Sequence, residues 1–468
     1  MSLQADRPPT GKSASDEAPL VLDLEAPPPR PLGLLDQGVL WLSMGASLLI
    51  AAAAVFVLFP LPGSPPLSIA AAVTVVVVGV LAGSTLLSLA AGIGARTGAP
   101  AMAMLRGLLG RRTSYLPTTL NLLQCFGWAA VEIFVIAAVA TALTGPGWRP
   151  FWVVVAGVTA TVMAVRPLGM VRLIRRYLGW LVLVSTVVLL VGLLRSGIPA
   201  SPGGGWSGFW VSFDVVVALP VSWIPLAADY TRHARTPRIA MVGAFGGYSL
   251  SSIAFFLLGL LSVLTVAGLD QQVTPTGFAV GLIGLPLGGL ALVVLLLDEV
   301  DKAFANVYSS AMSTQNLVPR VDRRVLAVGI GTVATLAALL ADLEQYESFL
   351  LLIGAVFVPL GVVLITDFYL VRRVVLGRVG YGYDVAEPGR GRWLLLLPWL
   401  AGFVVYQLVS PGLVDGWAQW WTSVRDGLGV VPPSWLSASV AAAVVAFVAT
   451  VVVGGALAVR LRRRRDRG

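Results

Sequence analysis

A cluster of ionisable residues interrupts a long apolar stretch in the second half of the chain. Asp298, Glu299, Asp301 and Lys302 follow an apolar run that begins at position 281. Asp298 and Lys302 are four residues apart, a spacing that favours an ion pair along one helix. Charged groups are costly inside a bilayer, and those that occur there commonly mark ion or proton pathways. The cluster predicts a cation or proton site; an ion pair that only holds helices together is the structural alternative.

A second polar set lies in an earlier apolar stretch. Gln124, Trp128 and Glu132 are spaced four apart, so they project from one face of a helix. An unpaired glutamate is unfavourable in lipid, and a deep indole N–H needs a partner. We expect this face to line a cavity. The alternative is a protonated Glu132 that bonds to a neighbouring helix.

Two further stretches predict interrupted helices. Pro220 and Pro225 flank Ser222 and Trp223, and two prolines five apart remove two helix donors near mid-membrane. Such irregular backbone is tolerated at bilayer depth only where it lines a cavity or is buried in protein. A milder weak point is the small-residue stretch 43–47, centred on Gly45.

The composition identifies the elements that must hold these residues. Of 468 residues, 57% are hydrophobic and 12% are charged, against about 25% charged in soluble proteins. This excludes an ordinary soluble enzyme and indicates a polytopic helical membrane protein, because about 20 apolar residues span a bilayer. The single cysteine, Cys125, excludes an intrachain disulfide. We expect twelve spans at roughly 36–60, 67–93, 114–144, 150–165, 177–195, 208–228, 240–267, 281–312, 325–341, 347–370, 393–410 and 436–459.

Basic residues predict the orientation of these spans. Alternate loops are rich in arginine, and the opposite loops hold only Arg149, Arg195 and Arg425. The positive-inside rule then places both termini in the cytoplasm. We expect the protein to lie in the cell inner (plasma) membrane. We predict a flexible cytoplasmic tail at 1–32, a transmembrane domain at 33–460 and a basic tail at 461–468. We interpret the net charge of +9 as a determinant of membrane topology and not as a sign of nucleic-acid binding.

The order of these features predicts two inverted repeats. An interrupted helix early in each half, with carboxylates in the third and eighth spans, fits spans one to five paired with six to ten. Spans eleven and twelve are then additions. The fold class is an all-α polytopic membrane protein with a 5+5 inverted repeat plus two C-terminal helices.

The same motifs carry a family resemblance. The chain resembles the nucleobase:cation symporter family of the purine–cytosine permease type, whose fold is LeuT-like with twelve spans. The narrower resemblance is to the branch proposed to import hydroxymethylpyrimidine, a thiamine precursor. The resemblance rests on the stretches 94–98, 127–128, 222–232, 298–309 and 349–369.

The resemblance implies roles for individual residues. Trp128 stacks on a flat substrate ring, and Glu132, where relatives often have an amide, hydrogen-bonds the ring edge. Trp223 supplies the second aromatic side chain. Gln124, Ser222 and Asn306 assist at the edge. An ionised glutamate accepts from an exocyclic amine, and a protonated ring nitrogen would make that pair bidentate.

The resemblance also implies a cation site between the break of span one and span eight. Family sodium sites use backbone carbonyls near Gly45 and hydroxyl groups of span eight. Here Asp301 and Lys302 occupy those hydroxyl positions, and Asp298 lies one turn before Lys302. A sodium site near Gly45 and Asp301 is one option. The other is that the Lys302 ammonium fills that site, and that loss of its proton replaces sodium binding. The coupling ion is therefore H+ or Na+, with no other cofactor expected.

We predict a monomeric secondary-active symporter that imports a small planar heterocycle, either hydroxymethylpyrimidine or a nucleobase such as cytosine. The expected partners are this substrate and the lipid bilayer. One alternative is an amino-acid or organocation transporter of the same fold, which needs a free helix N-terminus for a carboxylate. A channel fits less well with prolines at mid-membrane. A membrane-embedded enzyme is a further alternative, but His233 is the only histidine and no nucleophile–base pair is evident.

Overall fold

The computed structural model describes residues 24, 28–60, 65–166, 169–197, 204–267, 281–340, 346–380, 382–387 and 391–465. These residues are mainly helical and contain no β-strand apart from two isolated bridges. Their helices are α1 Leu34–Gly45, α2 Leu48–Leu58, α3 Ile69–Thr97, α4 Ala101–Leu109, α5 Tyr115–Thr144, η1 Pro146–Trp148, α6 Arg149–Val165, α7 Gly169–Arg195, α8 Phe209–Ser222, α9 Ile224–Thr231, α10 Pro237–Ala267, α12 Gly288–Leu317, α13 Arg323–Leu340, α14 Tyr346–Ile365, η2 Thr366–Val371, α15 Arg372–Leu376, η3 Arg392–Leu395, α16 Leu396–Val409, α17 Trp417–Gly427 and α18 Ala438–Arg465.

Most of these helices are built to cross a membrane. In the described ranges, nine helical segments are long and apolar enough to span a bilayer, and α1 with α2 forms a tenth span that bends by 53° at its break. Two other predicted spans correspond to α6, which has 17 residues, and to α12, which carries the ionisable cluster. The multi-pass helical architecture is confirmed, and the count of twelve spans stays a prediction.

Two short backbone bridges reveal the inverted repeat. Leu32 pairs with Ala234, so the chain before the first span meets the chain after the sixth. Leu67 pairs with Gly205, so the chain after the first span meets the chain before the sixth. Exchanging the two halves converts one bridge into the other, as a two-fold axis in the membrane plane requires.

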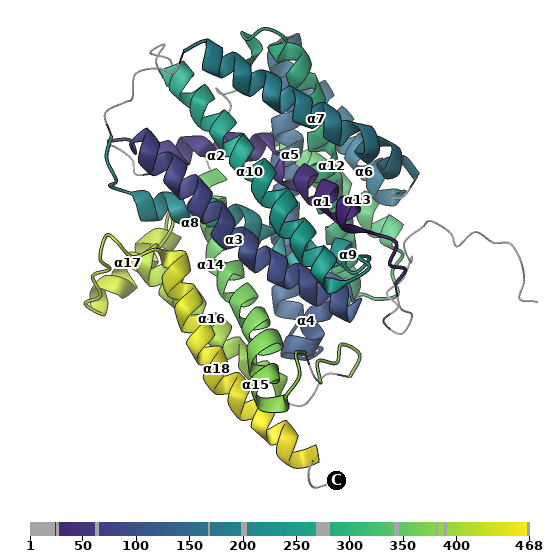
Figure 1. The fold of residues 1–468 in the computed structure, drawn as a ribbon, viewed down its shortest axis with the longest axis vertical. Coiled ribbons are helices and arrows are strands. Elements are labelled where there is room, and N and C mark those ends of the chain that lie inside the picture. Colours follow the sequence, from purple (N-terminus) through teal and green to yellow (C-terminus); the bar gives the residue numbers. More distant parts are fainter. Residues whose placement is uncertain are drawn as a thin grey trace, which may run out of the picture.

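Helix packing follows the same symmetry. The first span, α1 and α2, packs on α10, while the sixth span, α8 and α9, packs on α3. Both contacts need glycine: a Cβ at Gly247 would collide with the backbone of α1 at Gly38, and one at Gly83 would collide with Pro220. The additional helices α16 and α18 lie together against α14, on the far side of the molecule from α6, α7 and α13 (Figure 1).

One predicted boundary differs from the structure. The eighth span, predicted at 281–312, contains a turn at 284–287, and the continuous helix α12 begins at Gly288. Pro286 and the left-handed backbone of Leu287, with φ of 62°, account for this turn. The predicted N-terminal tail lies outside the described residues except for 24 and 28–32, and 28–32 are held by the segment 232–235.

The contacts of this N-terminal segment explain the structural role of His233. His233 Nδ1 lies 2.9 Å from the carbonyl of Pro29, and its Nε2 accepts from Nε of Arg232 at 3.1 Å. Leu32 N donates to the carbonyl of His233 at 3.1 Å. Burial, and then the charge of Arg232, lower the pKa of His233 to about 4, so the ring is neutral at pH 7. This histidine ties the chain ahead of the first span to the end of α9.

A buried carboxylate joins the last helix to the inverted repeats. Asp214 in α8 accepts from Oγ of Ser437 at 2.6 Å and from the backbone N–H groups of Ala438 and Ser439 at 2.9 Å each. These are the donors that the first turn of a helix leaves unpaired. Asp214 therefore caps α18 from a helix more than 200 positions earlier in the chain.

We expect Asp214→Ala to lower thermal stability, because loss of a helix cap costs about 0.5–2 kcal/mol and the two N–H groups have no alternative partner in this contact. Asp214→Asn should fall between this variant and the wild type. The measurement is the unfolding midpoint in detergent by intrinsic fluorescence. Asp426→Ala, at an exposed carboxylate, is the control; equal midpoints for the two alanine variants would contradict the capping role.

Candidate functional site

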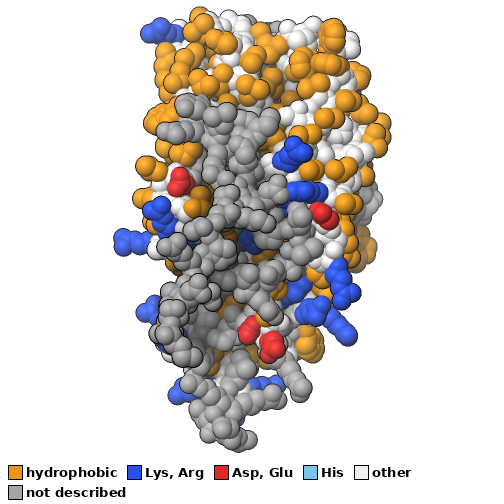
Figure 2. Space-filling view, turned by 90° about the vertical axis from the view of Figure 1, so that its right-hand side faces the viewer, with side chains coloured by type: hydrophobic (Ala, Val, Ile, Leu, Met, Phe, Trp, Pro, Cys, Tyr) orange, Lys and Arg blue, Asp and Glu red, His pale blue; other side chains and the backbone are white. Residues whose placement is uncertain are grey.

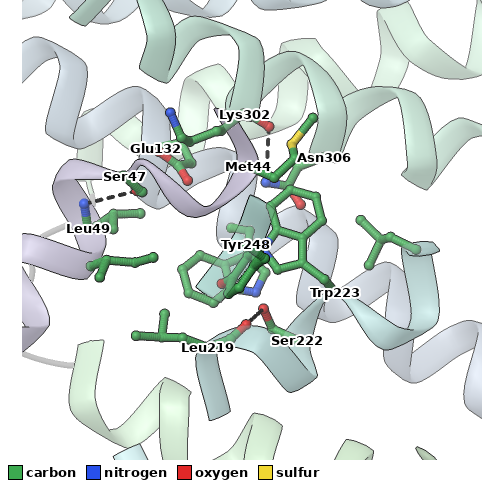
Figure 3. Close-up of a pocket in the computed structure, with 13 residues that line it drawn as sticks. Met44, Ser47, Leu49, Glu132, Leu219, Ser222, Trp223, Tyr248, Lys302 and Asn306 are labelled. Carbon is green, nitrogen blue, oxygen red and sulfur yellow. Dashed lines mark hydrogen bonds between the residues drawn. The ribbon is translucent and has the colours of Figure 1, made fainter. Parts of the chain in front are cut away.

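A cavity lies at the break of the first span. Its lining comes from both sides of that break and from four other parts of the bundle: α5, the α8–α9 junction, α10 and α12. Ser47, Glu132 and Lys302 lie along one wall, and Leu219 and Ser222 along the opposite wall (Figure 3). The lining residues are Met44, Ser47, Leu49, Ile50, Trp128, Glu132, Leu219, Ser222, Trp223, Leu226, Tyr248, Lys302 and Asn306.

Two carboxylates of α12 hold the broken first span. On the α1 side, Oγ of Ser43 donates to Asp298 Oδ1 at 2.9 Å. On the α2 side, Oγ of Ser47 donates to Glu299 Oε1 at 3.0 Å, and the backbone N–H of Leu48 donates to the same oxygen. A negative charge at a helix N-terminus is favourable, because the first N–H groups are unpaired and carry a partial positive charge. The interruption is therefore a defined, hydrogen-bonded structure.

Lys302 balances part of this negative charge. Its Nζ lies 2.5 Å from Asp298 Oδ2 and 3.1 Å from Glu299 Oε2, and it donates to the carbonyl of Asp298 at 3.2 Å. All three side chains are almost completely buried. A buried ammonium with two carboxylate contacts strongly favours its charged form. The lysine thus stands beside the break of the first span as a fixed cation.

Glu132 faces this cluster from α5 but, unlike Asp298 and Glu299, it forms no ion pair with Lys302. None of the ion pairs found among the described residues includes Glu132. Within the same part of the chain, Glu132 Oε2 and Trp128 Nε1 are buried and have no hydrogen-bond partner. Trp128 is 7% exposed and Glu132 4%, and both side chains line the cavity. Buried polar atoms are rarely left unpaired, which makes both candidates for contact with a ligand.

The two indoles that line the cavity are fixed by edge contacts with other rings. The Trp128 ring centre lies 5.2 Å from that of Phe349 and 6.0 Å from that of Tyr346. Trp223 meets the buried Trp41 edge-on at 6.2 Å. These edge-to-face contacts favour a fixed orientation of both indoles.

The sixth span is interrupted more gently than the first. Trp223 separates α8 from α9 in a helical conformation, and the hydrogen bond from Leu226 N to Trp223 O is of the shorter i, i+3 type at 3.0 Å. Gln124 Nε2 donates to the carbonyl of Ser222 at 2.8 Å. Gln124 therefore satisfies backbone at the interruption that Pro220 and Pro225 cause.

The predicted residues divide into two groups. Trp128, Glu132, Trp223, Ser222, Asn306 and Lys302 all line the cavity. The other four do not: Gln124 supports Ser222, Asp298 pairs with Lys302, and Asp301 is buried elsewhere on α12. Glycine is required at position 45 for helix packing, because a Cβ there would collide with Ser252 and the backbone of Tyr248 on α10.

Sequence reasoning missed several residues of the site. Met44 and Tyr248 line the cavity from α1 and α10, and Ser47 does so from the break. Glu299 was named in the ionisable cluster but not as a site residue, although it caps α2. The signal for Tyr248 was a tyrosine beside Ser249, Ser251 and Ser252 in the middle of the seventh span.

The described residues offer no group of three or more His, Cys, Asp or Glu side chains arranged to hold a metal ion. The carboxylate and hydroxyl oxygens of Asp298, Glu299, Ser43 and Ser47 at the break bond to one another or to Lys302. The cavity lining thus combines two indole rings, an unpartnered indole N–H and carboxyl oxygen, and a positive charge.

Known proteins share this architecture. Mhp1, a nucleobase–cation-symport-1 family transporter, solved in a closed conformation with bromovinylhydantoin bound, is similar with a TM-score of 0.71 and 17% identity, covering 95% of this chain and 96% of Mhp1. Its inward-facing conformation has a TM-score of 0.67 and 19% identity, covering 96% of each chain. At this identity the likeness establishes the fold, which is LeuT-like as predicted.

Sequence comparison identifies the family to which the chain belongs. The cytosine permease of Escherichia coli (strain K12) is 27% identical over 293 residues, 60% of this chain and 66% of that protein. A purine-cytosine permease of Emericella nidulans is 24% identical over 330 residues, 64% of this chain and 63% of that protein. The sequence profile of the family described as permease for cytosine/purines, uracil, thiamine, allantoin matches residues 40–378. The chain therefore belongs to this permease family, and it is a multi-pass membrane transporter of small heterocycles rather than an enzyme.

Proposed function

We propose that this carrier imports a planar nitrogen heterocycle that binds between Trp128 and Trp223. The observation that carries the proposal is the pair of unpartnered atoms, Trp128 Nε1 and Glu132 Oε2, in a cavity lined by both indoles. Stacking on the rings supplies affinity, and hydrogen bonds to the ring edge supply discrimination, because a ligand that leaves these buried atoms unpaired incurs their desolvation cost.

We further propose an aminopyrimidine as the substrate, with hydroxymethylpyrimidine and cytosine as the two candidates. A carboxyl group at Glu132 suits an exocyclic amine, which donates to it, better than an edge that offers only acceptors. The permease family and the cytosine permease of Escherichia coli support a pyrimidine, and the hydantoin bound in Mhp1 is another small planar ring. Asn306 and Ser222 add polar atoms to the same cavity.

Coupling without sodium follows from the position of Lys302. We propose that its ammonium, which pairs with Asp298 and Glu299, takes the place of a bound sodium ion beside the broken first span. The arrangement argues against an amino-acid carrier, because the N–H of Leu48 at the start of α2 already donates to Glu299. A substrate carboxylate would find this donor engaged and two carboxylates nearby.

The orientation with both termini in the cytoplasm, the location in the plasma membrane and the monomeric state stay part of the proposal. In Figure 2, Lys and Arg side chains gather over the middle and lower parts of the face, and the upper part is mainly hydrophobic apart from basic side-chain atoms at its top edge. Such a separation of basic and apolar surface supports a single basic side, as the positive-inside rule expects for the cytoplasm.

We expect Trp128→Ala to weaken binding of the pyrimidine by roughly 10- to 100-fold, since stacking of one base on an aromatic ring contributes about 1–3 kcal/mol. Trp128→Phe should retain part of the affinity. Thermal-shift titration of the purified protein with cytosine and hydroxymethylpyrimidine measures the effect. Trp180→Ala, at an indole that is 68% exposed on α7, is the matched control. The site is wrongly assigned if both alanine variants bind as the wild type does.

Replacement of external sodium by choline should leave uptake by the wild-type protein unchanged, because Lys302 supplies the positive charge. Lys302→Ala should abolish uptake and destabilise the protein, since removal of one partner of a buried ion pair costs about 3–5 kcal/mol. Lys302→Arg keeps the charge and should retain more stability. Radiolabelled uptake and the unfolding midpoint are the measurements. Uptake that requires sodium and resists a protonophore would contradict this assignment.

A further inference from the structure

The charges around the cavity do not balance. Glu132, Asp298 and Glu299 are three buried carboxyl groups, and Lys302 is the only cation paired with any of them among the described residues. Lys302 contacts Asp298 and Glu299, so Glu132 is the carboxyl group left without a counter-ion. An isolated carboxylate is very costly in a buried site and takes up a proton instead. In the empty cavity Glu132 must therefore hold a proton or bind a positively charged ligand.

Among the described residues, the surroundings of Glu132 hold no second cation, and its carboxyl group lies against that of Glu299, with which it can share a proton. From α12 it faces Asp298, Glu299 and Lys302; from α10 and α14 it faces the hydroxyl groups of Tyr248 and Tyr346. Two of the remaining cations on helices that pack against α5 lie over other aromatic rings. Arg149 of α6 lies over the Phe134 ring at 5.2 Å, and Arg323 of α13 lies over the Tyr308 ring at 5.1 Å.

We propose that Glu132 carries the coupled proton and shares it with the substrate. This inference rests on the proposed function. A carboxylic acid offers one O–H donor and one C=O acceptor, and the amidine edge of an aminopyrimidine offers a ring-nitrogen acceptor and an amine donor. The two edges match in a pair of parallel hydrogen bonds. Transfer of the proton to the ring nitrogen gives the same pair as a carboxylate with an amidinium, so the complex contains one proton in either form.

The proton balance of a transport cycle follows directly. Outside, one H+ from the medium forms an O–H bond with the Glu132 carboxylate, and the neutral substrate binds to the resulting acid. Inside, the substrate leaves, the O–H bond breaks and the proton enters the cytoplasm. One substrate and one positive charge therefore cross together. Lys302 keeps its proton throughout, because its contacts with Asp298 and Glu299 hold it in the charged form.

Glu132→Gln separates recognition from coupling. The glutamine amide has an NH2 donor and a C=O acceptor, so it pairs with the amidine edge as the neutral acid does, but it cannot release a proton. We expect the purified variant to bind cytosine at all pH values from 5 to 9 with one affinity. In wild-type protein the Kd should rise about tenfold per pH unit once the pH exceeds the value at which empty Glu132 ionises.

Proteoliposomes extend the test to transport. Wild-type protein should accumulate cytosine when the interior is alkaline, whereas Glu132→Gln should exchange internal for external cytosine without accumulation. Glu347→Gln, which makes the same chemical change at the start of α14 outside the cavity, is the matched control and should behave as wild type. Accumulation by Glu132→Gln under the same gradient would overturn the proposal.

Two measurements on unmodified protein keep the proposal testable if the variant fails to fold. Cytosine added to wild-type protein in weak buffer, at a pH where the wild-type Kd already rises tenfold per unit, should consume one proton for each molecule bound, as recorded with a pH indicator. Uptake should also carry inward positive current on a supported membrane. Binding with no proton uptake overturns the role of Glu132 but leaves the proposed function intact. Failure to bind any pyrimidine at any pH overturns both.

Discussion

The structure depends on the accommodation of charged side chains at the point where the first membrane span breaks. Asp298 and Glu299 take the unpaired donors of the break, from Ser43 on one side and from Ser47 and Leu48 on the other. Lys302 offsets part of the negative charge that this brings into the bundle. In hydrocarbon an interrupted helix without such partners is unfavourable. The interruption and the ionisable cluster therefore require each other, and the cavity exists because both are present.

The two inverted repeats meet this requirement in different ways. The first span is bent by 53° and is held by ions from α12, whereas the sixth is interrupted by prolines and held by the amide of Gln124. The pseudo-symmetric bridges at Leu32 and Leu67 tie the chain at each end of the first span to the chain at the opposite end of the sixth. The cavity thus has a charged wall beside the first interruption and an aromatic wall, shaped by prolines, at the second. A flat heterocycle with one polar edge fits such a division.

Glu132 stands between these two walls. It is close enough to the charged cluster to experience its field, yet it makes no ion pair with Lys302 and faces the same cavity as Trp128. In the mechanism proposed above, this side chain links substrate recognition to a proton, and the Lys302 ammonium takes the place of a second cation.

The sequence by itself determined the membrane class, the positions of most spans and the two interruptions, because apolar runs, proline and buried charge have direct physical consequences in a bilayer. It also identified Trp128, Glu132 and Lys302 as site candidates. Their spacing, and the free-energy cost of placing polar groups in a bilayer, can be judged from the sequence of a single helix. Only the tertiary structure decided that Glu299 caps α2, that Tyr248 lines the cavity and that Gly45 serves packing. These roles depend on contacts between helices that are distant in sequence, and no local pattern specifies which faces will meet.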